Sequence, residues 1–595
     1  MKKRRYSLLS SITVPFSLAP VSSFILSFFM IGRGVLAPID ILVRRRFIDG
    51  AIDAAKWGGD PRAVLPFLVA TLGIAFFVRL DYVPRWFAAL GIWMAGRRKY
   101  ARAILEKIAR LHFRYIEDKA TFDLIHRVSD EPENRIRDNL HNVVFLIDQV
   151  VHVVGVVTVV AAAGVWIVPV VTLLLIPIAY IAIHSGKTAF VADQERSSAT
   201  RLRRYYRDLS FRRESVAERR LFGMHQYILK KWQAAHGESM RVFLKAEKAN
   251  LITNGLTAKL PTYSLCVAVS IGLLFQLHRG VFSIGFYVAV ITSLGGLYEA
   301  MAETIPSLIR RLSRDRHYWR EVDHFFNLDE YRGNLSASVT PTSFAEIRFD
   351  NVHFRYPGTE REVLKGATFT ISEGGLYAFV GENGCGKSTV IKLMLGLYEP
   401  QEGRITIDGR NVADLIAEEL LGYFSVVFQD YARYQIKIRE NITLGDSGLK
   451  DPDLLARVLA QGNAEDIEAL PDGIDTLIGK AFGDGVDLSG GQWQKIAFCR
   501  GLYSRAPIRI LDEPTAALDP IAESALYEQY RELFTGFTSV FVSHRLGSTR
   551  LADQILLIHD GRVAEQGSHE DLMDSQGRYA RMFNLQRSWY QNEGE

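Results

Sequence analysis

The segment Gly381-Glu382-Asn383-Gly384-Cys385-Gly386-Lys387-Ser388 decides the fold of the C-terminal half of the chain. A short apolar run at residues 376–380 precedes it and is typical of a buried strand, and a helix-like run begins at Thr389. Glycines at these positions let backbone N–H groups turn inward around a phosphate, and the helix start adds the positive end of its dipole. The final lysine and serine then reach the β- and γ-phosphates and a Mg²⁺ ion. The sequence therefore predicts a P-loop in an α/β domain.

A second strand-like run, residues 508–511, ends in two carboxylates, Asp512 and Glu513. Asp512 suits an acid that holds Mg²⁺ through its hydration shell, and Glu513 suits one that orients or deprotonates an attacking water. Alone, such a pair is most simply a solvated strand end. Downstream of a P-loop, we interpret it as part of an ATP-hydrolysing site. Arg509 interrupts the run and would be costly if buried alone, so we expect a partner or a place near the strand start.

The N-terminal half contains long apolar runs, at residues 16–43, 63–95, 143–164, 165–185, 256–277 and 281–309. Each is close to or above the ~18–20 residues that cross a bilayer as a helix, so we expect six membrane-spanning helices. Charge-rich segments with helical spacing, residues 102–114 and 201–248, are expected to extend these helices into the cytoplasm as stalks.

The two halves differ in the sign of their charge. Residues 1–340 carry 46 Lys and Arg against 28 Asp and Glu, a net charge of +18, while residues 341–595 carry 25 against 38, a net charge of −13. The basic residues gather at 97–114 and 201–220, which lie on one side of a six-span topology. The positive-inside rule makes that side cytoplasmic, together with the N-terminus and the C-terminal domain. Membrane topology thus explains the charge better than nucleic-acid binding, and no nucleic-acid partner is expected. One local exception is Arg44-Arg45-Arg46.

Length and composition bound the domain organisation. The chain has 595 residues, of which 48% are hydrophobic, and three cysteines. These values exclude a disordered chain and a disulfide scaffold, and they leave room for several cores. A small polar stretch at residues 336–342 marks a change of periodicity. We therefore predict a six-helix membrane domain with cytoplasmic stalks at 1–335, a linker at 336–342 and an α/β P-loop ATPase domain at 343–595.

Further motifs carry a family resemblance. Leu488-Ser489-Gly490-Gly491-Gln492 matches the signature motif of ATP-binding cassette (ABC) transporters, which separates them from other P-loop ATPases. The remaining motifs of that family occur in its order, with Tyr356, Gln429, Asp519 and His544 at the matching positions. Because six spans precede one cassette, nearly the whole chain resembles an exporter-type half-transporter. The segment 479–487 is closer to that of bacterial peptide and lantibiotic exporters than to that of multidrug and lipid exporters.

The resemblance implies a role for each motif residue. Tyr356 would stack on adenine, a contact of ring faces that requires no base-specific hydrogen bond. Gln429 would sense the γ-phosphate and Mg²⁺, and His544 would hold the γ-phosphate and the water with Glu513. Singly, each has a simpler interpretation as a core aromatic or a satisfied polar side chain, but the ordered set favours function. The implied catalytic residues are Glu513, His544 and Gln429; the implied Mg²⁺ ligands are Ser388, Gln429 and Asp512; the implied ATP-binding residues are Tyr356, Gly381, Glu382, Asn383, Gly384, Cys385, Gly386, Lys387, Ser388, Thr389, Ser489, Gly490, Gly491, Gln492 and Asp519.

The resemblance also implies a partner and an activity. In the family, the signature of one cassette completes the ATP site of another, so a dimer is expected. A homodimer is favoured because Glu513 and an intact signature allow two competent sites, and a heterodimer stays open. The implied function is ATP-hydrolysing export of a substrate, with a peptide as first candidate, out of the cytoplasm across the inner (plasma) membrane. The alternatives are a lipid or multidrug flippase or exporter of the same fold, an importer on the exporter fold, and a non-transporting ATP-gated regulator or channel.

Some residues carry further hypotheses. Arg33 in the first span and Arg79, Asp81 and Arg85 in the second are costly in lipid and should face a cavity or a partner. The arginines can attract an anionic cargo group, but an internal ion pair of Arg79 or Arg33 with an acid, or a place beyond the bilayer edge, is the simpler interpretation. Residues 113–118 with 123–127, and residues 214–223, resemble the family's coupling regions. Cys385 predicts inhibition by thiol reagents through their bulk.

Overall fold

The computed structural model describes residues 6–161, 169, 200–212, 215–252, 259–331, 341, 343–479, 485–512, 536–543 and 546–591. Within this part, the chain divides into two compact units. One comprises Met1–Glu106 and Leu124–Leu328, and the other comprises Lys107–Asp123 and Asp329–Glu595. The predicted linker at 336–342, apart from Pro341, lies outside the described residues, and so does the predicted fourth span at 165–185, apart from residue 169.

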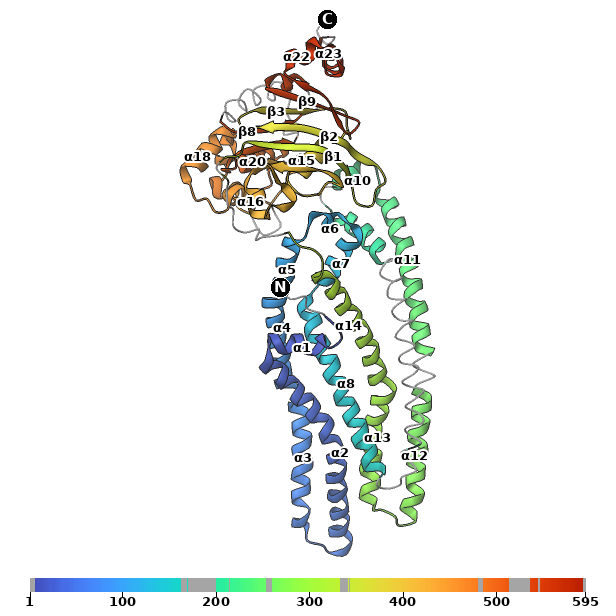
Figure 1. The fold of residues 1–595 in the computed structure, drawn as a ribbon. Helices are drawn as coiled ribbons and strands as arrows, with labels where there is room; N and C mark the ends of the chain where they lie inside the picture. Colours follow the sequence, from blue (N-terminus) through green and yellow to red (C-terminus); the bar gives the residue numbers. More distant parts are fainter. Residues whose placement is uncertain are drawn as a thin grey trace. The chain divides into compact units, whose positions relative to one another are not determined.

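The first unit is built from helices (Figure 1). They are α1 (Ser10–Leu18), α2 (Pro20–Trp57), a 3₁₀ turn (Pro61–Ala63), α3 (Leu65–Leu80), α4 (Tyr82–Ala95), a π-helical turn (Gly96–Tyr100), α5 (Ala101–Arg110), α7 (Lys119–Ser129), α8 (Pro132–Ala161), α10 (Val216–Leu221), α11 (His225–Asn250), α12 (Leu260–His278), α13 (Ile284–Glu299), a second π-helical turn (Ala300–Thr304) and α14 (Ile305–Phe326). The last residues of α5, from Lys107 on, and the first residues of α7, up to Asp123, belong to the second unit.

Five helical segments of the described chain are long and apolar enough to cross a membrane, and they match five of the six predicted spans. They are Pro20–Trp57, Pro61–Arg110, Pro132–Ala161, Leu260–His278 and Ile284–Phe326. The 38 residues of α2 make a helix of about 57 Å at 1.5 Å per residue. This length exceeds the ~30 Å hydrocarbon core of a bilayer. The prediction of an all-helical membrane domain is confirmed, and α2 continues beyond the bilayer core.

Glycines bring α2 and α8 close together. A Cβ atom on Gly34 would lie 2.6 Å from the carbonyl oxygen of Asp148, and one on Gly155 would lie 2.7 Å from Cγ of Pro38. Real side chains do not tolerate such distances, so only glycine fits at either position. In a bilayer, no hydrophobic driving force brings helices together, so their association relies on close van der Waals packing, which small residues permit.

Several charged residues near the spans form ion pairs with residues one turn away. Asp81, with a side chain only 1% exposed, pairs with Arg85 at 3.1 Å, one turn further along the helix. Arg44 pairs with Asp40 at 2.8 Å, and Arg45 lies 3.7 Å from Asp49. The interpretation paired Arg79 or Arg33 with an acid; the ion pair in the described part of these spans is instead that of Asp81 with Arg85. Two of the three arginines that depart from the positive-inside pattern also have acidic partners.

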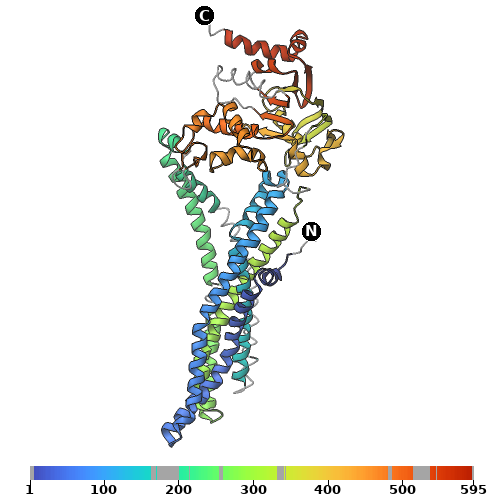
Figure 2. The same ribbon diagram turned by 90° about the vertical axis from the view of Figure 1, so that its left-hand side faces the viewer.

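The second unit contains both sheets (Figures 1 and 2). Its elements are α6 (Phe113–Glu117), β1 (Glu346–Arg355), β2 (Glu362–Ser372), β3 (Leu376–Val380), α15 (Lys387–Met394), β4 (Glu402–Ile407), β5 (Arg410–Asn411), α16 (Ala417–Gly422), β6 (Phe424–Val427), α17 (Ile438–Thr443), α18 (Pro452–Gln461), α19 (Glu465–Glu468), α20 (Gly490–Leu502), β7 (Ile508–Asp512), β8 (Thr538–Val542), β9 (Gln554–His559), β10 (Arg562–Gly567), α22 (His569–Asp574) and α23 (Arg578–Gln591), with 3₁₀ turns at Val412–Asp414, Leu444–Asp446, Gly473–Asp475 and Leu546–Leu551.

The larger sheet of this unit has the order β10-β9-β3-β8-β7-β6, in which β9, β3, β8, β7 and β6 run parallel. Every residue of β7 and β8 is buried. A parallel strand covered on both faces reads as a continuous apolar run, which explains the pattern of these segments in the sequence. The smaller sheet, β2-β1-β4-β5, is antiparallel. The predicted α/β fold of this part of the chain is confirmed.

Arg509 is the second residue of β7 and is 8% exposed. Its guanidinium lies 3.7 Å from the centre of the Phe537 ring. Burial lowers the pKa of Arg509 to about 10, so the side chain keeps its charge at neutral pH. Both features expected for this residue are present, because it has an aromatic partner and lies near the start of the strand.

Candidate functional site

The P-loop joins β3 to α15, as the apolar run and the helical run around it predict. Gly386 is the N-cap of α15 and has a φ of +115°, in the region that glycine adopts without strain. At Gly381 a Cβ atom would lie 2.3 Å from the carbonyl oxygen of Ile558. Lys387 is buried, and its Nζ donates to the carbonyl oxygens of Gly381 (2.8 Å) and Glu382 (3.1 Å). The loop thus curls around the lysine ammonium.

The order of the parallel strands brings the other motifs to the same edge of the sheet. The P-loop follows β3, Asp512 ends β7, and Ser543 directly follows β8, which lies between them. Gln429 comes shortly after β6, at the end of the sheet. The carboxyl ends of parallel strands meet at one edge, where α/β proteins bind their ligands. Residues separated by more than 150 positions in the sequence therefore lie at one edge of the sheet.

A cavity of about 590 Å³ occupies this edge. It is lined by Tyr356, Arg361, Val363, Asn383, Gly384, Gly386, Lys387, Ser388, Thr389 and Gln429. The predicted tyrosine, P-loop and glutamine thus contribute to one cavity. Gly381, Glu382 and Cys385 do not line it; the Glu382 carboxylate instead accepts a hydrogen bond from Arg578 at 2.9 Å, which lowers the pKa of Glu382.

Tyr356 is half-buried and held by its edges. Its hydroxyl lies 3.0 Å from Oγ1 of Thr389, and its ring meets those of Phe354 and Tyr398 nearly at right angles, with centroids 5.0 and 5.4 Å away. The ammonium of Lys392 lies 5.4 Å from the ring centre. A ring fixed in this way is suited to a flat, stacked ligand, because little side-chain conformational freedom is lost on binding.

The signature residues lie at the start of α20. Ser489 is the N-cap: its hydroxyl accepts from the backbone N–H of Gln492 at 3.2 Å, and the Gln492 side chain accepts from the Ser489 N–H at 3.1 Å. The first N–H groups of a helix have no intrahelical partner and attract an anion. Ser489, Gly490, Gly491 and Gln492 do not line the described cavity.

Three predicted residues, Glu513, Asp519 and His544, lie outside the described residues. Asp512 is 7% exposed at the end of β7. Ser388 and Gln429 line the cavity, and Asp512 is not among its lining residues. The hydroxyl, amide and carboxylate oxygens of these three side chains are donors that Mg²⁺ prefers, so their chemistry fits that ion.

Two contributions to the site escaped the sequence prediction. Arg361 and Val363 line the cavity from the β1–β2 connection and the start of β2. Lys392 reaches the Tyr356 ring from α15. A basic residue in a polar turn, such as Thr359-Glu360-Arg361, is an ordinary surface signal, so nothing in the sequence distinguishes Arg361 from other exposed arginines.

The fold and the cavity define a P-loop ATPase joined to a helical membrane domain. Residues 364–516 match the family model described as "ABC transporter". The chain is 24% identical to a chain in the "Structure of a bacterial Atm1-family ABC exporter with ATP bound", with a TM-score of 0.81, over 95% of this chain and 98% of that one. This likeness shows a shared fold.

Named relatives agree with this family. The "Subtilin transport ATP-binding protein SpaT" of Bacillus subtilis is 26% identical over 564 residues, which are 93% of this chain and 90% of SpaT. An "ATP-dependent lipid A-core flippase" of Aromatoleum aromaticum is 34% identical over 62% of this chain and 60% of its own length. The "Mycobactin import ATP-binding/permease protein IrtB" of Mycobacterium tuberculosis is 40% identical over 40% of this chain and 41% of its own length.

These findings identify the chain as an ABC transporter of the exporter-type half-transporter architecture. It is a membrane protein in which a helical domain is fused to one ATP-binding cassette, and its ATPase is coupled to transport.

Proposed function

We propose that the protein works as a dimer of two copies, each of which completes the ATP site of the other. The position of the signature supports this proposal: Ser489 to Gln492 begin α20 but do not line the P-loop cavity of their own chain. A γ-phosphate bound by Lys387 of one copy would meet the free N–H groups and dipole of α20 from the other. Both copies carry Glu513, so a homodimer has two competent sites.

Within each site, the residues have separate tasks. Tyr356 stacks on the base, and Lys387 exchanges the carbonyl oxygens of its own loop for phosphate oxygens. Ser388, Gln429 and Asp512 hold Mg²⁺, which when bound neutralises developing charge on the phosphates. Glu513 orients the attacking water and takes its proton, and His544 holds the γ-phosphate beside that water. Asp519 contributes to ATP binding.

The cytoplasmic face carries the cassettes, and the membrane is the inner (plasma) membrane. The basic segments 97–114 and 201–220 support this orientation through the positive-inside rule. The exporter-type arrangement, in which membrane spans precede one cassette, supports outward transport.

The cargo is a peptide. The observation that carries this proposal is the alignment with SpaT, which extends over 93% of this chain and therefore includes the membrane half that must bind the cargo. The lipid A-core flippase supports the second candidate, a lipid, over 62% of the chain. An importer is the third candidate because of the likeness to IrtB, which covers 40% of the chain.

Transport in reconstituted vesicles tests the proposal. With cassettes facing outward, export corresponds to ATP-dependent uptake of cargo into the vesicle lumen. We expect peptides to stimulate ATP hydrolysis and to accumulate inside, and Glu513→Gln to abolish both. Stimulation by lipid A-core lipids without any response to peptides would favour the flippase, and ATP-dependent release of preloaded cargo would favour the importer. ATP hydrolysis that drives no movement of either probe would contradict the peptide proposal.

A further inference from the structure

The segment that follows Gln429 is attached to the signature helix by direct hydrogen bonds. The hydroxyl of Tyr431 donates to the carbonyl oxygen of Gly490 at 3.1 Å. Gly490 is both the first residue of α20 and the second residue of the Ser-Gly-Gly-Gln signature. The bond therefore joins the loop that senses ATP in one site to the element that serves the other.

Arg500, on the same helix, makes a second attachment. Its guanidinium donates to the carbonyl oxygen of Ala432 at 3.3 Å, and to the carbonyl and side-chain oxygens of Asn441 at 3.0 Å each. Asn441 is fully buried and donates to the carbonyl oxygen of Tyr434 at 3.0 Å. A planar guanidinium that donates to several acceptors fixes backbone positions more firmly than one hydrogen bond does.

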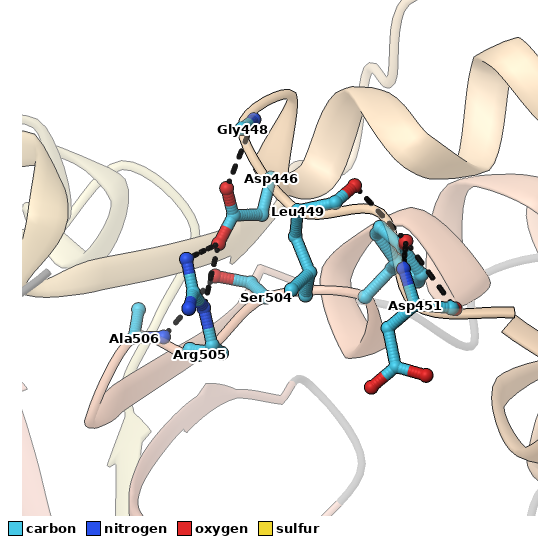
Figure 3. Close-up of polar contacts among 8 residues, drawn as sticks. Asp446, Gly448, Leu449, Asp451, Ser504, Arg505 and Ala506 are labelled. Carbon is cyan, nitrogen blue, oxygen red and sulfur yellow. Dashed lines mark hydrogen bonds and ion pairs between the residues drawn. The ribbon is translucent and has the colours of Figure 1, made fainter. Parts of the chain in front are cut away.

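The residues that directly follow α20 are also held by hydrogen bonds and an ion pair, as Figure 3 shows for Arg505. Arg505 pairs with Asp446 at 3.0 Å, and Asp446 in turn accepts from the N–H of Gly448 at 3.2 Å. The hydroxyl of Tyr503 donates to the carbonyl oxygen of Leu449 at 3.2 Å. Segment 431–434 is thus bonded to the start of α20 through Gly490 and to its last turn through Arg500, so a displacement of this segment acts on both ends of the helix.

We propose that Tyr431 is a positioning residue that links the two ATP sites of the dimer. When Gln429 moves on binding the γ-phosphate, the Tyr431–Gly490 bond shifts the start of α20, and with it the signature that faces the partner's ATP. The proposal rests on the proposed dimer and deepens it, because it names the path by which occupancy of one site changes the other. It assigns Tyr431 no contact with nucleotide.

Tyr431→Phe is the sharpest test, because it removes the hydroxyl and keeps the ring. Tyr434→Phe is the matched control. Tyr434 lies three residues further along, its ring keeps a cation–π contact with Arg500 at 5.0 Å, and among the described residues its hydroxyl has no hydrogen bond. Full-length wild type and both variants are reconstituted in lipid vesicles, and the ATPase rate is measured against ATP concentration, together with the melting temperature.

We expect wild type and Tyr434→Phe to hydrolyse ATP cooperatively, with a Hill coefficient between 1 and about 2 for two sites. For Tyr431→Phe we expect the Hill coefficient to fall to about 1 and the maximal rate to fall about fivefold, the factor that one neutral hydrogen bond carries. The affinity for a fluorescent ATP analogue and the melting temperature should stay within the range of the control.

Three results would overturn the inference. If wild type is cooperative and Tyr431→Phe matches it, the link is absent although the dimer stands. If both variants lose cooperativity equally, the loop is merely a structural element. If wild type itself hydrolyses ATP without cooperativity and remains monomeric with ATP, the proposed dimer fails and the link fails with it.

Discussion

At the scale of single residues, Cys385 gives the P-loop a free thiol that a reagent can modify. The thiol is partly buried, and a Cβ atom added at Gly381 would lie 2.7 Å from its sulfur. Burial raises the pKa of the Cys385 thiol. The reactive thiolate is therefore scarcer at neutral pH than in an exposed cysteine. Cys499 is fully buried, and burial raises its pKa to about 12, so it does not compete for reagents.

We expect N-ethylmaleimide to inhibit ATP hydrolysis slowly at pH 7 and faster as the pH rises, because deprotonation of Cys385 supplies the nucleophile. ATP should protect, since a filled P-loop leaves no room for the added group. Cys385→Ala should keep the ATPase rate and lose the inhibition. Rates of inactivation measured with and without ATP check this, and equal inhibition of Cys385→Ala would show that another cysteine is responsible.

Substitution of Tyr356 tests whether this end of the cavity binds adenine. Tyr356→Ala should weaken ATP binding about 5- to 150-fold, the range expected for loss of one aromatic stacking contact. The maximal rate of hydrolysis should change less, because the ring does not touch the reacting atoms. Tyr356→Phe keeps the ring, loses the bond to Thr389 and should bind nearly normally. Equilibrium binding of a fluorescent nucleotide measures the difference, and unaltered affinity in Tyr356→Ala would remove this residue from the site.

Spacing predicts the residues of this site well where a motif imposes its own geometry. Lys387 and Ser388 line the cavity because a strand, a glycine turn and a helix leave few alternatives, whereas Gln429, which lines the same cavity, was expected only from the family resemblance. Arg361 and Lys392 could not be predicted, because their place in the cavity depends on how β2 and α15 pack and not on any local pattern.

At the scale of elements, α6 illustrates what periodicity cannot predict. Residues 107–123 form part of the cassette unit, although they lie more than 200 positions before it. Phe113 packs against the cassette core and meets the Tyr398 ring edge-on at 5.7 Å. Glu117 lies 3.4 Å from Nζ of Lys392 and accepts a hydrogen bond from Tyr398. A resemblance suggested a coupling region here, but its partners arise from packing between segments far apart in the chain.

These contacts make Phe113→Ala a test of coupling. We expect transport and substrate-stimulated ATP hydrolysis to fall about 2- to 30-fold, the range of coupling energies carried by single contacts. Basal hydrolysis and ATP affinity should be retained, because Phe113 does not line the ATP cavity. Ile116→Ala, at an exposed residue of the same helix, serves as control. A parallel loss of basal and stimulated rates would assign Phe113 to folding and not to coupling.

Other elements were predictable from simple rules. Apolar runs of sufficient length predicted five described spans, and the strand-like runs with the P-loop predicted the α/β domain. The close approach of α2 and α8 was not predictable, since Gly34 and Gly155 become meaningful only when the two helices are placed together.

At the scale of the whole molecule, two different domains share one chain. The mean hydropathy of +0.04 averages a helical membrane domain and an ATPase domain. The net charge of +5 likewise combines +18 in residues 1–340 with −13 in residues 341–595. What composition could not predict is the cargo, because a membrane-domain surface chooses its ligand by shape and by a few polar groups, not by its average character.

We propose that this chain is an ATP-driven transporter in which Glu513 is the general base for ATP hydrolysis and transport depends on that hydrolysis. The most direct measurement compares phosphate release by purified wild type and Glu513→Gln in lipid vesicles, alongside binding of a fluorescent ATP analogue. Loss of a general base should lower hydrolysis by about 10²- to 10⁴-fold. Binding should persist, because Lys387, Ser388 and Tyr356 are unchanged. Hydrolysis by Glu513→Gln at the wild-type rate would contradict the assignment of Glu513 as the general base.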